Sequence, residues 1–248
     1  MTTIRSKQEL ALMREAGKIV AECHALLAEN LRPGISTKIL DRLVEKWILK
    51  RGAEPSFKGH HGFPGSICVA INDVICHGFP TDTPLQEGDV VTLDVGARYQ
   101  GYHGDSGWTY AVGKVTPEVK RLMEVGLESF HRGLEQVRPG NRIGDIGWAI
   151  QSYAEGEGYG VVREFTGHAV GQELWEEPPI PHFGIAHTGP GIESGMVLAV
   201  EPMITTGSWR AKVDADGWTA RTVDGSLCVQ YEHTIAVTDE SHEILTRL

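Results

Sequence analysis

Apolar residues recur along the chain with two periods, one helical and one extended. Within residues 40–47 and 143–150 they follow the three- and four-residue spacing of a helix with one apolar face. Two other segments carry residues that begin helices: Ser6 with Glu9 forms a capping box, and Thr116 with Pro117 gives an N-cap and a first-turn proline. The pattern therefore predicts four helices, two in each half of the chain.

Extended apolar runs bounded by Gly, Pro and Asp predict the strands. They cover residues 66–71, 90–95, 109–112, 197–201 and 231–237. The one-sided helices need an apolar surface on which to pack, and these strands supply it. The chain is therefore predicted to be of the α+β class.

The chain also repeats itself with a period near 106. Arg32-Pro33-Gly34 returns at 138–140, and the strand-like segment 88–94 returns at 195–201 with similar residues. Each copy of the turn follows one predicted helix and precedes another. We interpret the chain, residues 1–248, as a single domain of two α+β halves, about 1–112 and 113–248, fused around one continuous curved sheet.

Composition narrows the class of protein. With 248 residues, 41 % of them hydrophobic and 23 % charged, the chain is long and apolar enough for a sizeable core. The net charge of −10 argues against nucleic acid or an anionic membrane as partner. Neither a secretory signal nor a membrane span is predicted, and the four cysteines match neither a zinc pattern nor a disulfide framework. We therefore expect a cytoplasmic protein, and a monomer because no extended apolar segment is predicted to be exposed.

Acidic residues stand where apolar strands end, and a buried carboxylate there needs a partner. Asp94 and Glu201 end such runs and Glu232 interrupts one, while a hairpin through the glycine-rich loop 96–104 could return Asp105 beside Asp94. With His168, which lies in a segment where glycine would allow close approach of a ligand, they are the five candidates. If they converge, each pair of carboxylates about 4 Å apart costs on the order of 4 kcal/mol at an effective dielectric of ~20. Two divalent cations would cancel the four negative charges. Hard oxygens with one nitrogen suit Mn²⁺, Fe²⁺, Co²⁺ or Zn²⁺.

The segments around these residues resemble the metal-ligand blocks of type I methionine aminopeptidases, in the same order. They read LDVGARYQGYHGDSGWTYAVG, TGHAVGQELWEEP, VLAVEPMI and QYEHTIAVTDE. The resemblance implies the pita-bread fold, with a curved, mainly antiparallel sheet, and a two-metal site. Asp94 would bind one ion, His168 and Glu201 the other, and Asp105 and Glu232 both. A water between the metals would be the nucleophile, and Glu201 would relay its proton.

The segment HGFPGSICVAINDVICHGFP resembles the substrate-facing stretch of the same family. The resemblance implies that His77 contacts the scissile peptide. It also implies a pocket for the methionine side chain, formed by Phe63, Cys68, Met203 and Trp218, where sulfur and aromatic surface suit a thioether.

At two positions the sequence departs from the family pattern. Trp175 stands where the family has a second histidine that contacts the substrate carbonyl, and loss of such a donor costs ~10²–10³ in turnover. His60 stands where a tyrosine is common, which predicts a wider or more polar pocket. Trp175 either weakens catalysis or has a role of its own. The accompanying changes at Ala169 and Gln172 favour the second interpretation.

We therefore predict a cytoplasmic two-metal exopeptidase that removes the initiator methionine from nascent chains. One alternative is an Xaa-Pro aminopeptidase or dipeptidase of the same fold. Those enzymes usually carry an additional N-terminal domain, for which the helix expected at Ser6 leaves no room. The other alternative is a pita-bread binding module without catalysis. Trp175 supports it, and the five intact ligand positions oppose it.

Overall fold

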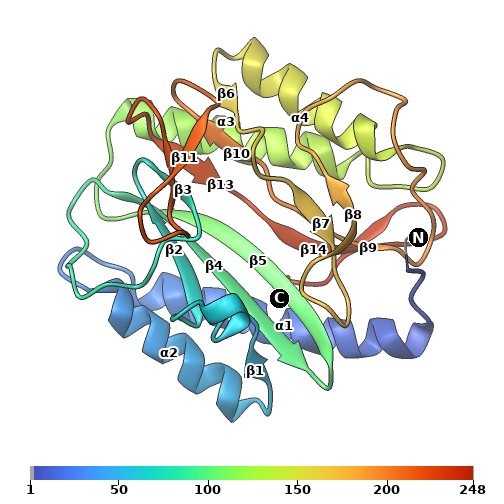
Figure 1. The fold of residues 1–248 in the computed structure, drawn as a ribbon, viewed down its shortest axis with the longest axis horizontal. Helices are drawn as coiled ribbons and strands as arrows, with labels where there is room; N and C mark the ends of the chain where they lie inside the picture. The colour runs from blue at the N-terminus through green and yellow to red at the C-terminus, as the bar shows by residue number, and fades with distance from the viewer. Residues whose placement is uncertain (1–2, 248) are drawn as a thin grey trace.

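The computed structural model describes residues 3–247, and in them four long helices cover the outer surfaces of antiparallel sheets (Figure 1). The helices are α1 (Lys7–Asn30), α2 (Thr37–Lys50), α3 (Pro117–Leu134) and α4 (Ile143–Gly156), with a short 3₁₀ helix η1 (His60–Gly62). Both predicted caps are present. Ser6 Oγ accepts a hydrogen bond from the Glu9 amide at 3.3 Å, and Thr116 Oγ1 accepts one from the Val119 amide at 3.3 Å. None of the described helices is long and apolar enough to cross a membrane.

Fifteen strands are described, and every pair between them is antiparallel. They are β1 (Glu54–Pro55), β2 (Ile67–Ile71), β3 (Val74–Cys76), β4 (Val90–Tyr99), β5 (Tyr102–Ala111), β6 (Gly160–Val161), β7 (Gly167–Ala169), β8 (Glu176–Ile180), β9 (Val197–Val200), β10 (Met203–Thr205), β11 (Ala211–Val213), β12 (Ala220–Thr222), β13 (Cys228–Gln230), β14 (His233–Val237) and β15 (His242–Ile244). The α+β prediction with mainly antiparallel strands is confirmed.

The long hairpin β4–β5 extends well beyond the two runs that the sequence predicted. Its strands pair from Val90↔Ala111 to Tyr99↔Tyr102, through glycines that resemble loop residues in the sequence. Close packing explains these glycines, because a Cβ on Gly104 would lie 2.7 Å from the backbone nitrogen of Gly17 in α1. Helix α1 therefore crosses β5 at backbone contact distance, and glycine here marks packing rather than a turn.

The predicted single continuous sheet is divided into four. The orders are β1-β4-β2 with β5 beside β4, β13-β10-β6, β11-β12-β3 and β15-β14-β9-β7-β8. The chain leaves the ladder at Glu201-Pro202, after β9, and at Glu232, between β13 and β14. Proline lacks the amide proton that a ladder needs, and both carboxylates turn into a pocket. A single bridge, Trp108↔Tyr231, joins β5 to the segment between β13 and β14.

Apolar side chains form two main clusters. One lies entirely within residues 19–112, under α1 and α2, and the other, apart from Val90, within residues 119–237, under α3 and α4. Each pair of helices thus packs on its own sheet surface, as the one-sided apolar patterns predicted. The interpretation of the chain as two pseudo-symmetric halves agrees with this arrangement and stays a prediction.

His24 is a buried imidazole where α1 crosses β5. Nε2 donates to the Ser106 carbonyl at 2.9 Å, and Nδ1 accepts from the Tyr110 hydroxyl at 2.9 Å. Burial lowers the pKa of His24 to about 4. In the unfolded chain this histidine therefore binds a proton near pH 6.5, whereas in the folded chain it does so only near pH 4. The free energy of unfolding therefore falls as the pH falls through this range.

We expect His24→Gln to lose stability at pH 7, because its hydrogen bonds are disturbed, and to lose less than the wild type on acidification from pH 7 to 5. Urea unfolding at both pH values measures the difference. His187→Gln, at an imidazole whose side chain is 90 % exposed, is the control. An equal pH dependence in His24→Gln and wild type would contradict the expectation.

Candidate active site and metal centre

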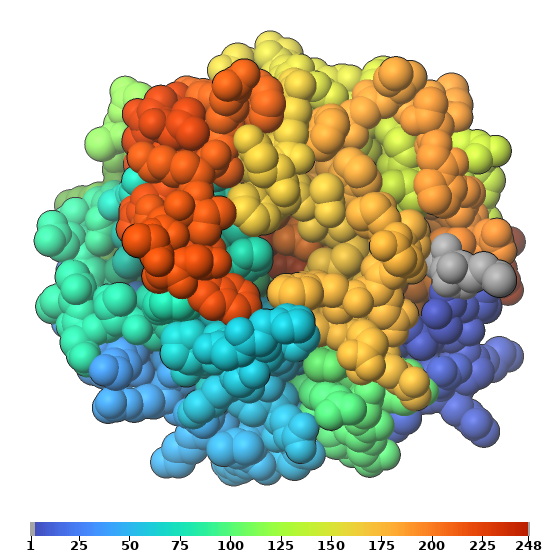
Figure 2. Space-filling model, in the orientation of Figure 1, coloured from blue at the N-terminus to red at the C-terminus, as the bar shows by residue number. Residues whose placement is uncertain are grey.

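A pocket of about 420 Å³ opens between the two groups of helices, where the molecule is hollowed (Figure 2). Every residue that the sequence analysis nominated for the site lines it. They are His60, Phe63, Cys68, His77, Asp94, Asp105, His168, Trp175, Glu201, Met203, Trp218 and Glu232. The residues come from both halves of the chain, so the pocket forms only when the halves pack together.

The hairpin β4–β5 brings Asp94 and Asp105 to one face. Asp94 pairs with Gly107 and Asp105 with Gly96, so the two carboxylates are diagonal neighbours on the same side of the ladder. The sequence predicted this return across the glycine-rich loop. The position opposite Asp94 leaves little space for a side chain, because a Cβ on Gly107 would lie 3.0 Å from Oε2 of Glu232.

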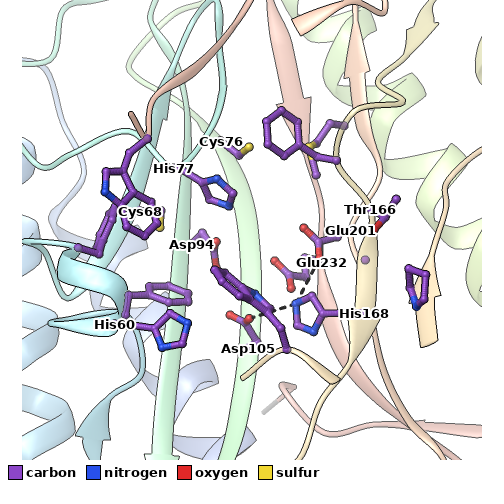
Figure 3. Close-up of a pocket in the computed structure, with 18 of the residues that line it drawn as sticks. His60, Cys68, Cys76, His77, Asp94, Asp105, Thr166, His168, Glu201 and Glu232 are labelled. Carbon is purple, nitrogen blue, oxygen red and sulfur yellow. Dashed lines mark ion pairs between the residues drawn. The ribbon is translucent and has the colours of Figure 1, made fainter. Parts of the chain in front are cut away.

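His168 lies in β7, Glu201 directly follows β9, and Glu232 lies at the break before β14. His233 pairs with Val200, which places Glu232 beside Glu201 where both strands leave the ladder, and His168 pairs with Ala199. The backbone holds the two sides together, since the Glu232 amide donates to the Gly107 carbonyl at 2.7 Å. The five side chains point toward one centre (Figure 3).

The distances within this cluster are those of groups that share a ligand. Nε2 of His168 lies 3.5 Å from Oε1 of Glu201 and 3.9 Å from Oδ2 of Asp105. One ligand atom from each of Asp105, His168 and Glu232 can be chosen so that all lie within 4.8 Å of one another. The amide of Gln230 lies 3.4 Å from Oε2 of Glu201 and 3.3 Å from Oε2 of Glu232 and orients both.

Burial raises the pKa of every carboxyl group in the cluster, and repulsion from neighbouring carboxylates adds to it at three of them. Burial raises the pKa of Asp94 to about 7. The pKa values of Asp105, Glu201 and Glu232 lie well above their usual range, because burial and the neighbouring carboxylates both disfavour the charge. Without cations the cluster takes up protons, as the charge argument from the sequence predicted.

The cluster has the properties of a cation site. Burial lowers the pKa of His168 to about 4, so its ring is neutral at pH 7. Nδ1 donates to the Ala169 carbonyl at 3.0 Å, so the lone pair on Nε2 faces carboxylate oxygens that also accept. Oδ1 of Asp94 and Oδ1 of Asp105 are buried without a hydrogen-bond partner among the described residues. Carboxylate oxygens and an imidazole lone pair that face one another require a cation or protons between them. The five residues therefore fit divalent metal ions.

Aromatic rings and sulfur form the wall of the pocket beside this cluster. The Phe63 ring lies 5.2 Å from that of Trp218 and 5.3 Å from that of Phe79, both edge to face. Cys68 packs with Phe63, whereas Met203 packs with a neighbouring apolar cluster around Cys76. All four residues predicted for the methionine pocket thus line one cavity, although they belong to two packing groups.

Imidazole and indole rings surround the mouth of the pocket. The Trp175 ring lies 4.8 Å from that of His60, 6.3 Å from His61, 6.4 Å from His168 and 6.5 Å from His77. His77 has a left-handed backbone with φ 58°, which is uncommon for a residue other than glycine and often marks a functional position. Trp175 therefore joins the two halves across the opening.

Several residues of the site escaped the sequence analysis. Cys76, Phe165, Thr166 and Glu176 also line the pocket. Nε2 of the buried His182 accepts a hydrogen bond from the Glu201 amide at 3.1 Å. The signal for His182 in the sequence is weak, because a lone histidine 19 residues before Glu201 looks like any core residue.

Comparison with known proteins places the chain in a family. The model of metallopeptidase family M24 matches residues 11–239. Methionine aminopeptidase 1 of Bacillus subtilis (strain 168) is 50 % identical over 248 residues, which is the full length of both chains. The methionine aminopeptidase structure from Rickettsia prowazekii is 42 % identical, with a TM-score of 0.97 over 99 % of this chain and 100 % of that one. The Xaa-Pro dipeptidase from Bacillus anthracis is 27 % identical with a TM-score of 0.78, and the match covers only 62 % of its length. The chain therefore belongs to metallopeptidase family M24, among its methionine aminopeptidases.

Proposed function

We propose that this protein releases the N-terminal methionine of peptides by hydrolysing the first peptide bond at a two-metal centre. The observation that carries the proposal is the pocket itself, in which four buried carboxylates and one neutral imidazole adjoin a wall of aromatic rings and sulfur. The full-length similarity to methionine aminopeptidases supports methionine as the residue released, and it favours this activity over the Xaa-Pro alternative.

Five side chains would hold the metals. Asp94 would bind one ion, His168 and Glu201 the other, and Asp105 and Glu232 both, so that four negative charges meet four positive ones. When bound, such ions lower the pKa of a coordinated water toward neutrality and polarise the substrate carbonyl. Mn²⁺, Fe²⁺, Co²⁺ and Zn²⁺ all suit these donors, and metal supply decides among them.

The protein's own groups would orient the substrate and move the proton. Burial and the charge of Asp94 increase the proton affinity of the Glu201 carboxylate, which suits it to accept a proton and pass it to the leaving amine. Burial lowers the pKa of His77, so that its ring is neutral and can hydrogen-bond the scissile peptide without adding charge. The side chain of the methionine would lie against Phe63, Cys68, Met203 and Trp218, and His60 would make the outer wall more polar.

The substrates we propose are chains that begin with methionine, among them nascent proteins in the cytoplasm. The acidic protein has no need of nucleic acid or membrane for this reaction, and a monomer contains the whole pocket.

Release of methionine from Met-Ala and Met-Gly peptides, after reconstitution with Co²⁺, Mn²⁺ or Fe²⁺, tests the proposal. We expect release with at least one ion and its loss on chelation. No release with any of the ions would overturn the proposed function.

Peptides that differ only in the first residue test the pocket. We expect a Leu-Ala peptide to be cleaved ~10- to 100-fold more slowly than a Met-Ala peptide, because a branched chain misfits a slot for a thioether and each misfit group costs ~1–3 kcal/mol. Values of kcat/KM for both peptides decide the point. Comparable values of kcat/KM for the two peptides would contradict the proposal that Phe63, Cys68 and Trp218 form a pocket for the methionine side chain.

A further inference from the structure

The loop that carries Trp175 joins β7, the strand of His168, to β8. It covers residues 170–175, and its buried Leu174 packs with Phe63 and Cys68 in the pocket wall. Trp175 itself is 44 % exposed at the mouth of the pocket. The position of the indole thus depends on what holds this loop.

One carboxylate, that of Glu176, ties the loop together. Its Oε1 accepts the backbone amides of Gln172 at 3.0 Å and Glu173 at 3.3 Å. Its Oε2 is paired with the guanidinium of Arg5, which lies 171 positions earlier in the chain. Glu176 follows Trp175 directly, so the group that closes the loop is adjacent to the indole.

The guanidinium of Arg5 is buried beside two carboxylates, that of Glu176 and that of Glu9, whose Oε1 lies 4.0 Å from Nη1. The Arg5 side chain is only 5 % exposed, and its own amide donates to the Gly195 carbonyl at 2.8 Å, which fixes the backbone beside β9. The guanidinium lies against the loop at Gly171, since a Cβ there would be 1.7 Å from Nη2 of Arg5. Glycine at 171 therefore allows the close approach of Arg5.

A second tether runs parallel to the first. The Gln172 side-chain amide donates to the Tyr102 hydroxyl at 3.0 Å, and that hydroxyl donates to Oε1 of Glu9 at 2.9 Å. Arg5 and Glu9 both lie where α1 begins. In Figure 2 the segment around residue 60 touches the yellow to orange part of the chain at the edge of the hollow.

We propose that the buried Arg5–Glu176 ion pair is a positioning device for Trp175, which holds the indole against His60 and so fixes the wall that the peptide meets as it enters. The idea rests on the proposed function, because the peptide is the ligand that this wall meets. Neither residue touches the reacting atoms, and both act through Trp175. A small displacement of a substrate-positioning group can cost up to ~100-fold in rate, so the effect is measurable.

Hydrogen exchange on the metal-free protein tests the positioning without any need for activity. We expect Arg5→Gln and Glu176→Gln to accelerate amide exchange in residues 170–176 by at least tenfold. The matched control is Arg14→Gln in α1, which breaks the exposed pair of Arg14 with Glu243 of β15. We expect it to leave exchange in this loop unchanged. Equal exchange in Arg5→Gln, Arg14→Gln and wild type would overturn the proposal.

A double-mutant cycle tests the route through the indole. We expect Arg5→Gln to raise KM for a Met-Ala peptide about tenfold with a smaller change in kcat, and to have no further effect in a Trp175→Ala background. Arg5→Lys, which keeps the charge, should restore part of the loss. If Arg5→Gln does not fold, Glu176→Gln carries both tests. If Arg5→Gln raised KM equally with and without Trp175, the pair would have a general structural role and the proposal would be refuted. If the wild-type protein released no methionine, the proposed function would be refuted, and the exchange experiment alone would then test whether the ion pair positions Trp175.

Discussion

Replacement of Asp105 by Asn is expected to abolish both metal loading and hydrolysis. The change keeps the shape of the side chain and removes one of four negative charges and a ligand that we assign to both ions. Loss of an outer partner of a metal ligand already costs ~10–100-fold in affinity, and Asp105 is proposed as a ligand itself. Metal content after dialysis and methionine release from a Met-Ala peptide measure the two effects.

In the metal-free protein we expect the same substitution to be favourable, because it should increase the stability of the fold. The pKa of Asp105 is raised well above its usual range by burial and by the Asp94 charge, so ionisation near neutral pH destabilises the fold. Asn cannot ionise. We therefore expect metal-free Asp105→Asn to unfold at a higher temperature than metal-free wild type at pH 7, with the difference vanishing toward pH 4. Addition of metal should reverse the order.

Asp89→Asn is the control for these measurements. Asp89 precedes β4, accepts hydrogen bonds from the Asn72 side chain and the Gln86 amide, and lies outside the pocket. It should keep its metal and its activity. Full activity in Asp105→Asn, or equal loss in both variants, would contradict the two-metal assignment.

The convergence of the five proposed ligands could be predicted in part, because Glu201 and Glu232 stand where strands end, although Asp94 and Asp105 lie within β4 and β5 rather than at their ends. A hairpin with the right register is enough to bring Asp94 and Asp105 together. Two strands that stop at neighbouring positions are enough to bring Glu201 beside Glu232. Local pattern and charge cost together identify such residues. What the pattern missed was the length of β4–β5, since glycines required by the passage of α1 look like loop residues.

The supports of the site could not be predicted, because they depend on contacts between distant segments. Arg5 pairs with Glu176 across 171 positions, and His182 meets only the backbone amide of Glu201. Neither residue forms a motif with its neighbours in the sequence. The division of the sheet was missed for a related reason: Glu201 and Glu232 were predicted to be ligands, whereas their effect on strand pairing depends on where the pocket opens.

Trp175 stands where the resemblance implied a second histidine, and its surroundings in the structure favour a role of its own for the indole. The ring packs edge to face on His60 at 4.8 Å and lies 6.4 Å from the ring of His168. If Trp175 had replaced the family's second histidine without a role of its own, no specific packing against His60 would be expected. Each aromatic pair is worth ~0.5–1.5 kcal/mol, or roughly 2- to 13-fold.

We therefore expect kcat/KM for a Met-Ala peptide to fall about tenfold in Trp175→Ala and to fall also in Trp175→His, with little change in metal content because residue 175 is not a proposed ligand. Trp148→Ala is the matched control, since Trp148 on α4 is 49 % exposed and lies outside the pocket. If Trp175 had only replaced a hydrogen-bond donor without a role of its own, Trp175→His would instead raise turnover, by as much as the ~10²–10³ that one oxyanion donor supplies. Equal or higher values in both variants would rule out a productive indole. A loss in both, absent from Trp148→Ala, requires that the ring itself takes part in binding the peptide.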